Sequence, residues 1–515
     1  MKIFTAAPDT ATQPLTALLL RASLYLLALF LLCLSYWIHR YFGKPDLHQI
    51  TYHLKFGAEL VRSSDPEFTR RFVRWCVQMP LLLLGLLMLA EPGLRRHLAC
   101  LQQPWRRPLI ILQRRLPALL LLAAIGFWLY DVSALKYATA NFGPNYFGTH
   151  YVQPGKLALD ASRAKNLIVI YVESLETGYA NRKVFGRDLL APLTALRGTS
   201  FASYQQAPGT GWTIAALVAT QCGVPLERVT IFDGNTQGQM IKSFLGNAVC
   251  LPDILAQQGY RNVFMGGGSP TFAGKDKFLA QHHYHEVYGR EYWLKTGARE
   301  RDMNGWGLYD RDLFARAKSK LHQLVSSRQK FNLTVLTVDT HEPAGHLSAG
   351  CAQQGYAGFD GVVSCTASEV ADFVRYVRDQ GYLETTNIVI LGDHLARKNP
   401  ASEQLEPQPH RTIFNAFLSK EPPKPNREQV LHFDMLPTIL EFAGVAIPGG
   451  RLGLGYSAFN QHPESTPAPD RLDDMDKDLL NRSSEYMALW PTPGADDSND
   501  GNDGDNDPDA ALNRH

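Results

Sequence analysis

The sequence has almost no net charge to indicate a partner. Among 515 residues, 51 Lys and Arg nearly balance 49 Asp and Glu, which leaves a formal net charge of +2. Nucleic-acid-binding proteins usually carry a clear basic excess, so we expect no nucleic-acid partner. The chain is longer than one ordinary domain and can bury a large core.

Cysteine is scarce, and no two cysteines have the CxxC spacing typical of zinc fingers. Four of the seven lie in the polar part of the chain: Cys222, Cys250, Cys351 and Cys365. An even number there suits disulfides in an oxidising compartment; four buried thiols are the alternative. Four cysteines allow three pairings, and proximity in sequence favours Cys222–Cys250 with Cys351–Cys365.

The N-terminal third lacks a convincing signal-peptide cleavage site but contains three apolar runs. They extend over 15–38, 72–90 and 116–130, and each approaches the ~20 residues that span a bilayer. Arg21 lies near one end of the first run, where its side chain can snorkel to the interface. We therefore predict a membrane region over residues 1–131 with about three transmembrane helices. Buried helices of a soluble domain are the alternative.

Charges between the second and third runs predict the orientation of this region. The segment 91–115 contains six arginines and one glutamate. The positive-inside rule places such a loop in the cytoplasm, so everything after Asp131 is predicted to lie outside. We expect a multi-pass inner-membrane protein whose polar part faces the oxidising side.

Beyond the membrane region the sequence predicts a linker, one large domain and a tail. Residues 132–162 are irregular and indicate a juxtamembrane tether. Over residues 163–460, apolar strand-like runs alternate with helical patterns, which predicts an α/β domain with a mostly parallel sheet flanked by helices. Residues 461–515 turn polar and then acidic, and we predict a disordered tail. The expected strands are 167–172, 261–265, 332–338 and 388–391, and the expected helices are 212–220, 251–258, 313–324 and 367–380.

Charged residues directly follow two of the predicted strands. The run that begins at Asn166 ends at Glu173, and the run that begins at Asn387 ends at Asp393 and His394. Parallel sheets place their chemistry at the carboxyl ends of strands, and carboxylate with imidazole suits a divalent cation. A polar strand end or a surface loop explains each residue singly. Together they predict a metal site at one sheet edge.

Thr210 is a candidate nucleophile. It stands between two glycines just before a predicted helix, so its hydroxyl can be exposed at a helix start, where amide N–H groups favour anions. A hydroxyl that contacts a metal loses its proton more easily. The alternative is that Thr210 or Thr213 simply caps the helix.

Two further residues lie near predicted strand ends. His341 follows the strand 332–338 and can donate to a phosphoryl oxygen or protonate a leaving group; a structural histidine is the alternative. Lys275 follows a glycine run and can bind phosphate as a point charge; a solvated lysine is the alternative.

In order along the chain, these segments resemble the phosphoglycerol transferase I family of Gram-negative bacteria. That family is related to lipoteichoic acid synthase within the alkaline phosphatase and sulfatase superfamily. The resemblance covers about residues 163–458, including the four cysteines. It is carried by the stretches at 171–176, 208–215, 221–226, 272–276, 306–310, 336–341 and 393–396.

The resemblance implies an enzyme and a set of site residues. It implies a divalent metal held by Glu173, Thr210, Asp393 and His394, usually Mn²⁺, with Zn²⁺ or Mg²⁺ possible. It also implies Thr210 as nucleophile, and Lys275, Trp306 and His341 as substrate-binding residues. The family moves glycerol phosphate from phosphatidylglycerol to a periplasmic glucan and releases diacylglycerol.

The residues at the expected site also bear on three alternative functions. A sulfatase needs Cys or Ser at the nucleophile position, with Pro and Arg shortly after, and Thr210-Gly-Trp-Thr-Ile214 does not fit. A phosphoethanolamine transferase also uses a threonine and stays an alternative. A non-catalytic, membrane-tethered glycan-binding protein is the alternative of a different class. Larger family members continue past the catalytic domain, whereas this sequence turns to an acidic tail, which leaves the acceptor open.

Overall fold

The computed structural model describes residues 15–42, 66–101, 104–132, 142–226 and 243–490. The chain divides into two compact units, one that contains the N-terminal helices and one that contains all residues from Ala140 onwards together with His48–Ser63. Each is described by itself.

The described part of the N-terminal unit consists of three long apolar helices. Each is long and apolar enough to cross a membrane, and leucines such as Leu19, Leu82 and Leu122 are exposed on it, as a lipid-facing surface requires. Three candidate spans is the number that the sequence predicts, and their insertion in a membrane stays a prediction. The helices are α1 (Leu15–Phe42), the continuous run α4 (Pro66–Val73), η1 (Arg74–Gln78) and α5 (Met79–Ala99), and α6 (Arg106–Asp131).

Two details of this unit differ from prediction. The third helix begins at Arg106 rather than Leu116, because leucine and arginine are both good helix formers and the polar start is no barrier. Arg21 does not snorkel. It is buried and forms an ion pair with Glu91, and it donates to the Arg114 carbonyl at 3.1 Å.

The second unit is an α/β domain built on a mostly parallel sheet, as predicted. Its six strands run in the order β4-β3-β5-β1-β6-β7, and only β7 is antiparallel to its neighbour. Four of the five parallel strands, β1, β3, β5 and β6, are the ones predicted from the sequence. The fifth, β4, is a short strand at the edge of the sheet. The strands are β1 (Asn166–Val172), β3 (Arg261–Gly266), β4 (Glu286–Tyr288), β5 (Phe331–Leu336), β6 (Thr386–Gly392) and β7 (Asn415–Leu418).

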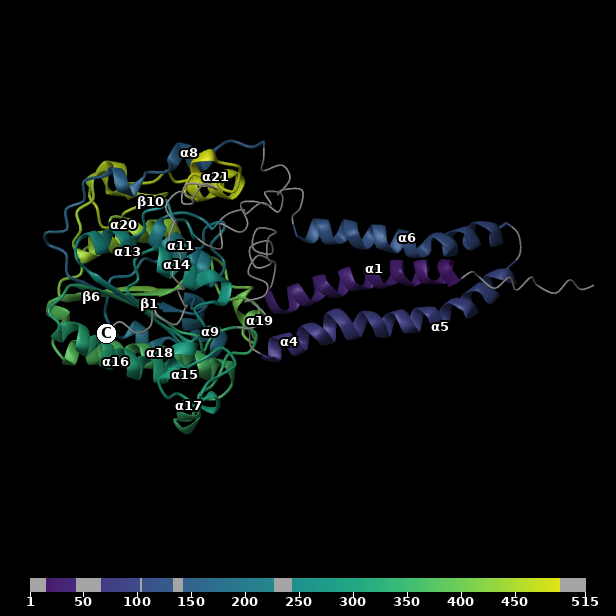
Figure 1. Cartoon of the computed structure of the whole chain (residues 1–515), viewed down its shortest axis with the longest axis horizontal. Helices are drawn as coiled ribbons and strands as arrows, with labels where there is room; N and C mark the ends of the chain where they lie inside the picture. Colours follow the sequence, from purple (N-terminus) through teal and green to yellow (C-terminus); the bar gives the residue numbers. More distant parts are fainter. Residues whose placement is uncertain (1–14, 43–65, 102–103, 133–141, 227–242, 491–515) are drawn as a thin grey trace, which may run out of the picture. The chain divides into compact units, whose positions relative to one another are not determined.

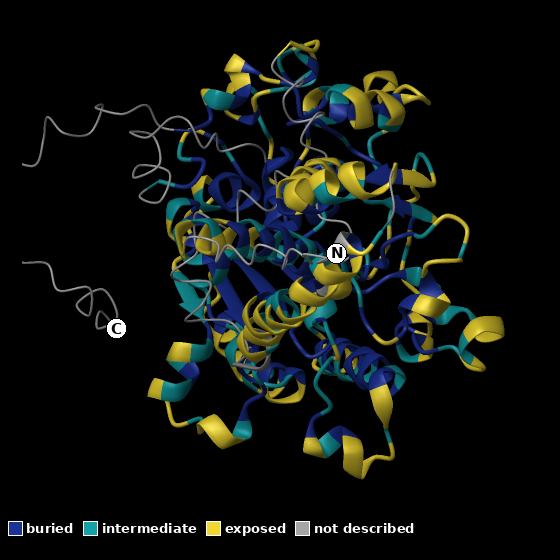
Figure 2. Cartoon of the chain, turned by 90° about the vertical axis from the view of Figure 1, so that its right-hand side faces the viewer, coloured by how far each residue is buried: buried dark blue, intermediate teal, exposed yellow. Residues whose placement is uncertain are grey.

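Helices cover both faces of this sheet. Alternate residues of β1 point to opposite faces, so that Val169 and Tyr171 join one core and Ile168 and Ile170 the other. Figure 1 shows α11, α13 and α20 on one side and α16 and α18 on the other, and Figure 2 shows the buried interior. The helices of this unit are α8 (Tyr146–His150), α9 (Arg182–Phe185), α10 (Ala191–Thr194), α11 (Thr213–Cys222), α13 (Leu251–Gln257), α14 (Lys275–Gln281), α15 (Arg290–Lys295), α16 (Asp310–Ser326), α17 (Ala349–Gln353), α18 (Gly358–Asp379), α19 (Ser402–Leu405), α20 (Met435–Ala443), α21 (Arg471–Asp478) and α22 (Ser484–Met487).

Two small sheets are also present in the described part of this unit. One pairs β2 (Ser203–Gln205) in parallel with β8 (Gln429–Leu431), and the other pairs β9 (Arg451–Leu452) with β10 (Gly455–Tyr456). The first is important for the site, because both of its strands lead into it.

The expected linker and tail contain folded segments. Phe147, within the expected tether, is buried, and backbone bridges join Val152 to Gly453. The prediction of a disordered tail is wrong for residues 461–490, where α21 and α22 bury Met475 and Tyr486 in the core. Their few apolar side chains are spaced among acidic residues, so composition alone suggests disorder. Residues 491–515, the acidic end, lie outside the described residues.

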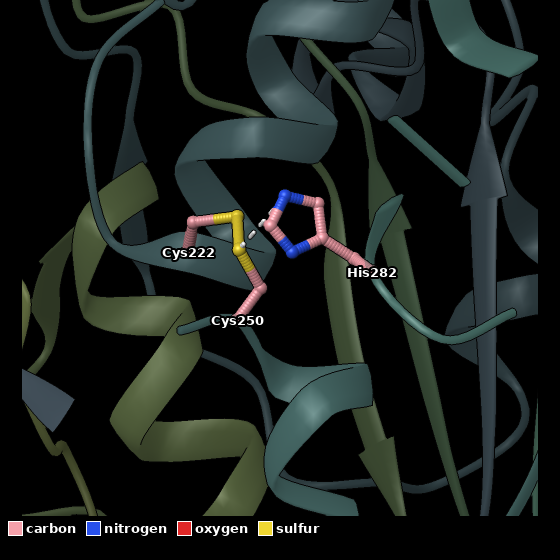
Figure 3. A group of neighbouring side chains, drawn as sticks. All are labelled: Cys222, Cys250 and His282. Carbon is pink, nitrogen blue, oxygen red and sulfur yellow. Dashed lines mark hydrogen bonds between the residues drawn. A yellow bond between two sulfur atoms is a disulfide. The ribbon is translucent and has the colours of Figure 1, made fainter. Parts of the chain in front are cut away.

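The disulfides have the pairing favoured by proximity. Cys222 is joined to Cys250, and Cys351 to Cys365. Figure 3 shows the His282 ring beside the first disulfide, with Nε2 at 3.8 Å from the sulfur of Cys250. The two sulfurs are bonded to each other, so this group is a buried structural crosslink rather than a metal site.

Candidate active site

The register of the sheet brings the predicted ligands to the same level. Tyr171 is opposite Leu391 and Val172 is opposite Gly392 in the β1–β6 pair. The next residues, Glu173 and Asp393, therefore leave adjacent strands side by side. Glycine is required before Asp393, because a Cβ at Gly392 would lie 1.9 Å from the Leu175 carbonyl oxygen.

Glu173, Asp393 and His394 form one buried cluster. Their exposed fractions are 2%, 0% and 2%, which excludes the surface-loop alternative. One ligand atom from each lies within 4.8 Å of the others. The Nε2 atom of His394 is 3.5 Å from both Glu173 Oε1 and Asp393 Oδ2.

The hydrogen bonds around the cluster fit a divalent cation. His394 Nδ1 lies 2.9 Å from the Leu395 carbonyl oxygen, which can only accept, so Nδ1 carries a hydrogen and Nε2, which faces the carboxylates, is the nitrogen that can bind a cation. Asp393 Oδ2 is buried and has no hydrogen-bond partner among the described residues. An unpartnered buried carboxylate oxygen is costly unless a cation neutralises it. Two carboxylates and one imidazole are ligands that divalent metals use.

The backbone beside Glu173 is held in an uncommon conformation. Ser174 has a φ of 54°, in the left-handed region. Its amide donates to Asp393 Oδ1 at 2.7 Å, and its hydroxyl donates to Glu173 Oε1 at 2.8 Å. These bonds tie the ends of β1 and β6 together and fix the separation of the two carboxylates.

Thr210 is positioned by the small parallel sheet. It follows β2 by five residues, and Gly209, with a φ of 73°, turns the chain before it. Its hydroxyl is buried, 2.6 Å from the Ala207 carbonyl oxygen and 3.1 Å from His432 Nδ1. The helix-cap alternative does not hold, because Trp212 is the N-cap of α11 and no side chain bonds to the helix there. Thr213 instead donates to Glu173 Oε2 at 3.2 Å.

His432 is a site residue that sequence reasoning missed. It directly follows β8, the partner of β2, and is fully buried. Its Nε2 lies 2.8 Å from the Asp393 carbonyl oxygen, so one imidazole contacts both Thr210 and the backbone of Asp393. Burial lowers the pKa of His432 to about 4. Like Glu173, His432 is a polar residue at the end of a strand. That strand, β8, has only three residues, which are too few to reveal a strand in the sequence.

A row of aromatic rings connects Lys275 to Trp306 and His341. Lys275 Nζ lies 4.8 Å from the centre of the Phe272 ring. The ring centres of Phe272 and Trp306 are 5.1 Å apart, and those of Trp306 and His341 are 4.2 Å apart. The solvated-lysine alternative is wrong, since the Lys275 side chain is buried and donates to the Phe272 carbonyl at 2.8 Å. Burial lowers its pKa to about 8, against the charges of Glu173 and Asp276.

A buried network holds Trp306 and His341 in place. The Asn304 side chain accepts from the Trp306 amide at 2.8 Å and donates to Asp339 Oδ1 at 2.8 Å. Asp339 lies two residues before His341, so the network joins the ring row to the end of β5. Trp306 Nε1 is buried without a hydrogen-bond partner in the described part of the chain.

We expect cation affinity to fall about tenfold or more for each pH unit below about 7. Burial, followed by the charge of Glu173, raises the pKa of Asp393 to about 7. Burial lowers the pKa of His394, but Asp393, Glu173 and Glu342 outweigh it and leave that pKa raised. Below these pKa values a cation must displace a proton, so affinity rises with pH and then levels off.

Calorimetric titration of the detergent-solubilised chain with Mn²⁺ across this pH range measures the slope. Thermal unfolding at each pH serves as the control for acid unfolding. An affinity that does not change with pH would show that protons and the cation do not compete at this cluster.

Comparison with known proteins gives matches to one kind of domain. The family model described as Sulfatase matches residues 165–445. Two curated proteins named phosphoglycerol transferase I, from Escherichia coli O6:K15:H31 and Escherichia coli strain K12, are 36% and 35% identical to this chain over 343 residues. The alignments cover 64% of this chain and 43% of each relative, so the chain spans less than half the length of these relatives.

Among solved structures, the lipoteichoic acid synthase LtaP of Listeria monocytogenes is similar to this chain. It is 18% identical, with a TM-score of 0.49, and the match covers 66% of this chain and 97% of that one.

Proposed function

Because the chain belongs to the sulfatase family, whose model matches residues 165–445, we propose that it transfers glycerol phosphate from phosphatidylglycerol to a glycan. The predicted relationship to the alkaline phosphatase and sulfatase superfamily is confirmed by that match. The choice of reaction within the family is the proposal. It is supported by the relatives named phosphoglycerol transferase I, which share 35–36% identity over the domain.

One observation supports the proposal: hydrogen bonds join the segment that contains Thr210 to the cluster of Glu173 and Asp393. Thr210 is linked through His432 to Asp393, and Thr213 on the same segment contacts Glu173. Glu173, Thr210, Asp393 and His394 would hold the cation, for which we propose Mn²⁺, with Zn²⁺ or Mg²⁺ as the alternatives. When bound, the cation would lower the pKa of the hydroxyl and neutralise charge on the phosphoryl oxygens.

The first step exchanges one ester bond at phosphorus for another. Thr210 Oγ1 bonds to the phosphorus of phosphatidylglycerol as the bond from phosphorus to the diacylglycerol oxygen breaks. Thr210 Oγ1 releases its proton to water, and a protonated His341 on the leaving-group side gives one proton to the diacylglycerol oxygen. Lys275 and Trp306 hold the phosphoglycerol group, because Trp306 lies beside His341 and Lys275 joins the same ring row through Phe272.

The second step regenerates the threonine. A glycan hydroxyl bonds to phosphorus, the bond to Thr210 Oγ1 breaks, and the acceptor proton is released as Thr210 is protonated again. The same residues hold the phosphoryl group in both steps, so one site serves donor and acceptor in turn.

The proposed location places the site on the outer side of a bacterial inner membrane. Three apolar helices supply the anchor, and arginines between the second and third favour the cytoplasm under the positive-inside rule. The two disulfides suit the periplasm, an oxidising compartment. Phosphatidylglycerol of the outer leaflet is then the donor, and a periplasmic glucan the acceptor.

Head-group labelling tests this function. The purified chain is incubated with vesicles that carry either glycerol-labelled phosphatidylglycerol or ethanolamine-labelled phosphatidylethanolamine, with and without a glucan. We expect label on the glucan and free diacylglycerol only with phosphatidylglycerol. Transfer of ethanolamine label would favour a phosphoethanolamine transferase, and glucan binding without any transfer would favour a non-catalytic binding protein.

A further inference from the structure

His432 contacts the Thr210 hydroxyl without being one of the candidate cation ligands. It is 0% exposed and lies at the carboxyl end of β8. Its two ring nitrogens face different elements: Nε2 faces the carbonyl of Asp393, and Nδ1 faces the segment that contains Ala207 and Thr210.

The neighbours of the ring determine its tautomer. Nε2 lies 2.8 Å from a carbonyl oxygen, which can only accept, so Nε2 carries the hydrogen. Nδ1 lies 3.4 Å from the Ala207 amide, which can only donate, so Nδ1 presents its lone pair. His432 is therefore an acceptor toward Thr210.

The Thr210 hydroxyl has one hydrogen and two acceptors. The Ala207 carbonyl oxygen is at 2.6 Å and His432 Nδ1 at 3.1 Å. Whichever of the two takes the hydrogen, the lone pairs of Oγ1 remain free for other partners. Without Nδ1, the hydroxyl keeps only the Ala207 carbonyl as its acceptor and the ring no longer links its segment to Asp393.

We propose that His432 is a positioning residue for Thr210, which holds the nucleophilic oxygen at a fixed place relative to the end of β6. This inference rests on the proposed function, because it assigns Thr210 as the nucleophile. The hydrogen bond from Nε2 to the Asp393 carbonyl fixes the ring to the strand that supplies Asp393 and His394, and Nδ1 then fixes the hydroxyl. Gln206 strengthens the same link, since its side-chain oxygen accepts from the Leu395 amide at 2.9 Å.

Three substitutions separate positioning from packing. His432→Asn keeps an acceptor oxygen near the place of Nδ1. His432→Gln reaches the place of Nε2 but leaves no acceptor at Nδ1, and His432→Phe fills the space with neither nitrogen. We expect the rate of Thr210 modification by phosphatidylglycerol to fall about 100-fold in the Gln and Phe variants, and by no more than about tenfold in the Asn variant.

Two readouts are measured on the full chain in detergent with phosphatidylglycerol vesicles. Intact-protein mass spectrometry follows single-turnover formation of the adduct at several lipid concentrations, and calorimetry gives the affinity for Mn²⁺. We expect the maximal rate to fall while the lipid concentration at half-maximal rate and the Mn²⁺ affinity stay within about threefold of the unmodified chain.

The outcomes distinguish this inference from the proposed function. Wild-type rates in the Gln and Phe variants, with Thr210→Ala inactive, would overturn the positioning role alone. An Asn variant as slow as Phe, or loss of Mn²⁺ affinity along with the rate, would show a structural role and also overturn it. Full transfer by Thr210→Ala would overturn the proposed function itself.

Discussion

Replacing Thr210 with alanine is expected to reduce diacylglycerol release from phosphatidylglycerol vesicles by at least about 10³-fold. The variant loses the one hydroxyl that bonds to His432 and lies on the segment that contacts the carboxylate cluster. Among the described residues no other hydroxyl is hydrogen-bonded to His432, so we expect only slow attack by water in its place. Diacylglycerol is measured by thin-layer chromatography of labelled lipid.

Two matched variants accompany this experiment. Thr210→Ser keeps a hydroxyl at the same place and is expected to stay within about tenfold of the unmodified chain. Thr296→Ala removes an exposed hydroxyl of the same type that bonds only to helix carbonyls, and should have no effect. Full activity of Thr210→Ala would contradict the two-step scheme.

Replacing Glu173 with glutamine is expected to lower Mn²⁺ affinity by at least about 100-fold and to abolish transfer. Glutamine has the shape of glutamate but lacks its charge, so the ligand set loses one of its two carboxylates. The metal-free variant should be at least as stable as the metal-free parent, because the charge of Glu173 raises the pKa of Asp393 and hence opposes its ionisation. Calorimetry and thermal unfolding in a chelator measure the two effects.

Glu384→Gln is the control for this change. Glu384 is exposed and pairs with Lys420 on the surface, so its substitution should alter neither affinity nor activity. If Glu173→Gln bound Mn²⁺ as tightly as the parent, the cation site would have to lie elsewhere. If it unfolded without metal, the carboxylate would be a structural group instead.

The sheet and its carboxyl edge could be predicted from the sequence because their signals are local. The apolar runs before Glu173 and Asp393 are long and rich in β-branched residues, and they fold as β1 and β6 with the expected ends. Parallel pairing then places the residues after them at one edge, whichever helices connect them. The disulfides could be predicted for a similar reason, because each cysteine pairs with its neighbour in the sequence.

The remaining parts depend on contacts distant in sequence. His432 is 222 residues from Thr210, and β8 is too short to show a pattern. The sequence around Lys275 is that of an ordinary surface lysine, and only the packing of Phe272 and Trp306 reveals its burial. Residues 461–490 have an acidic composition, yet a few apolar side chains dock on a core supplied by other segments.

Mass spectrometry of the purified chain tests the central claim most directly. After incubation with phosphatidylglycerol and Mn²⁺ but no glycan, we predict an added mass of one phosphoglycerol group, carried by the peptide that contains Thr210. Addition of glucan should remove it. An unmodified chain that still releases diacylglycerol, or a modification on any residue other than Thr210, would contradict the account.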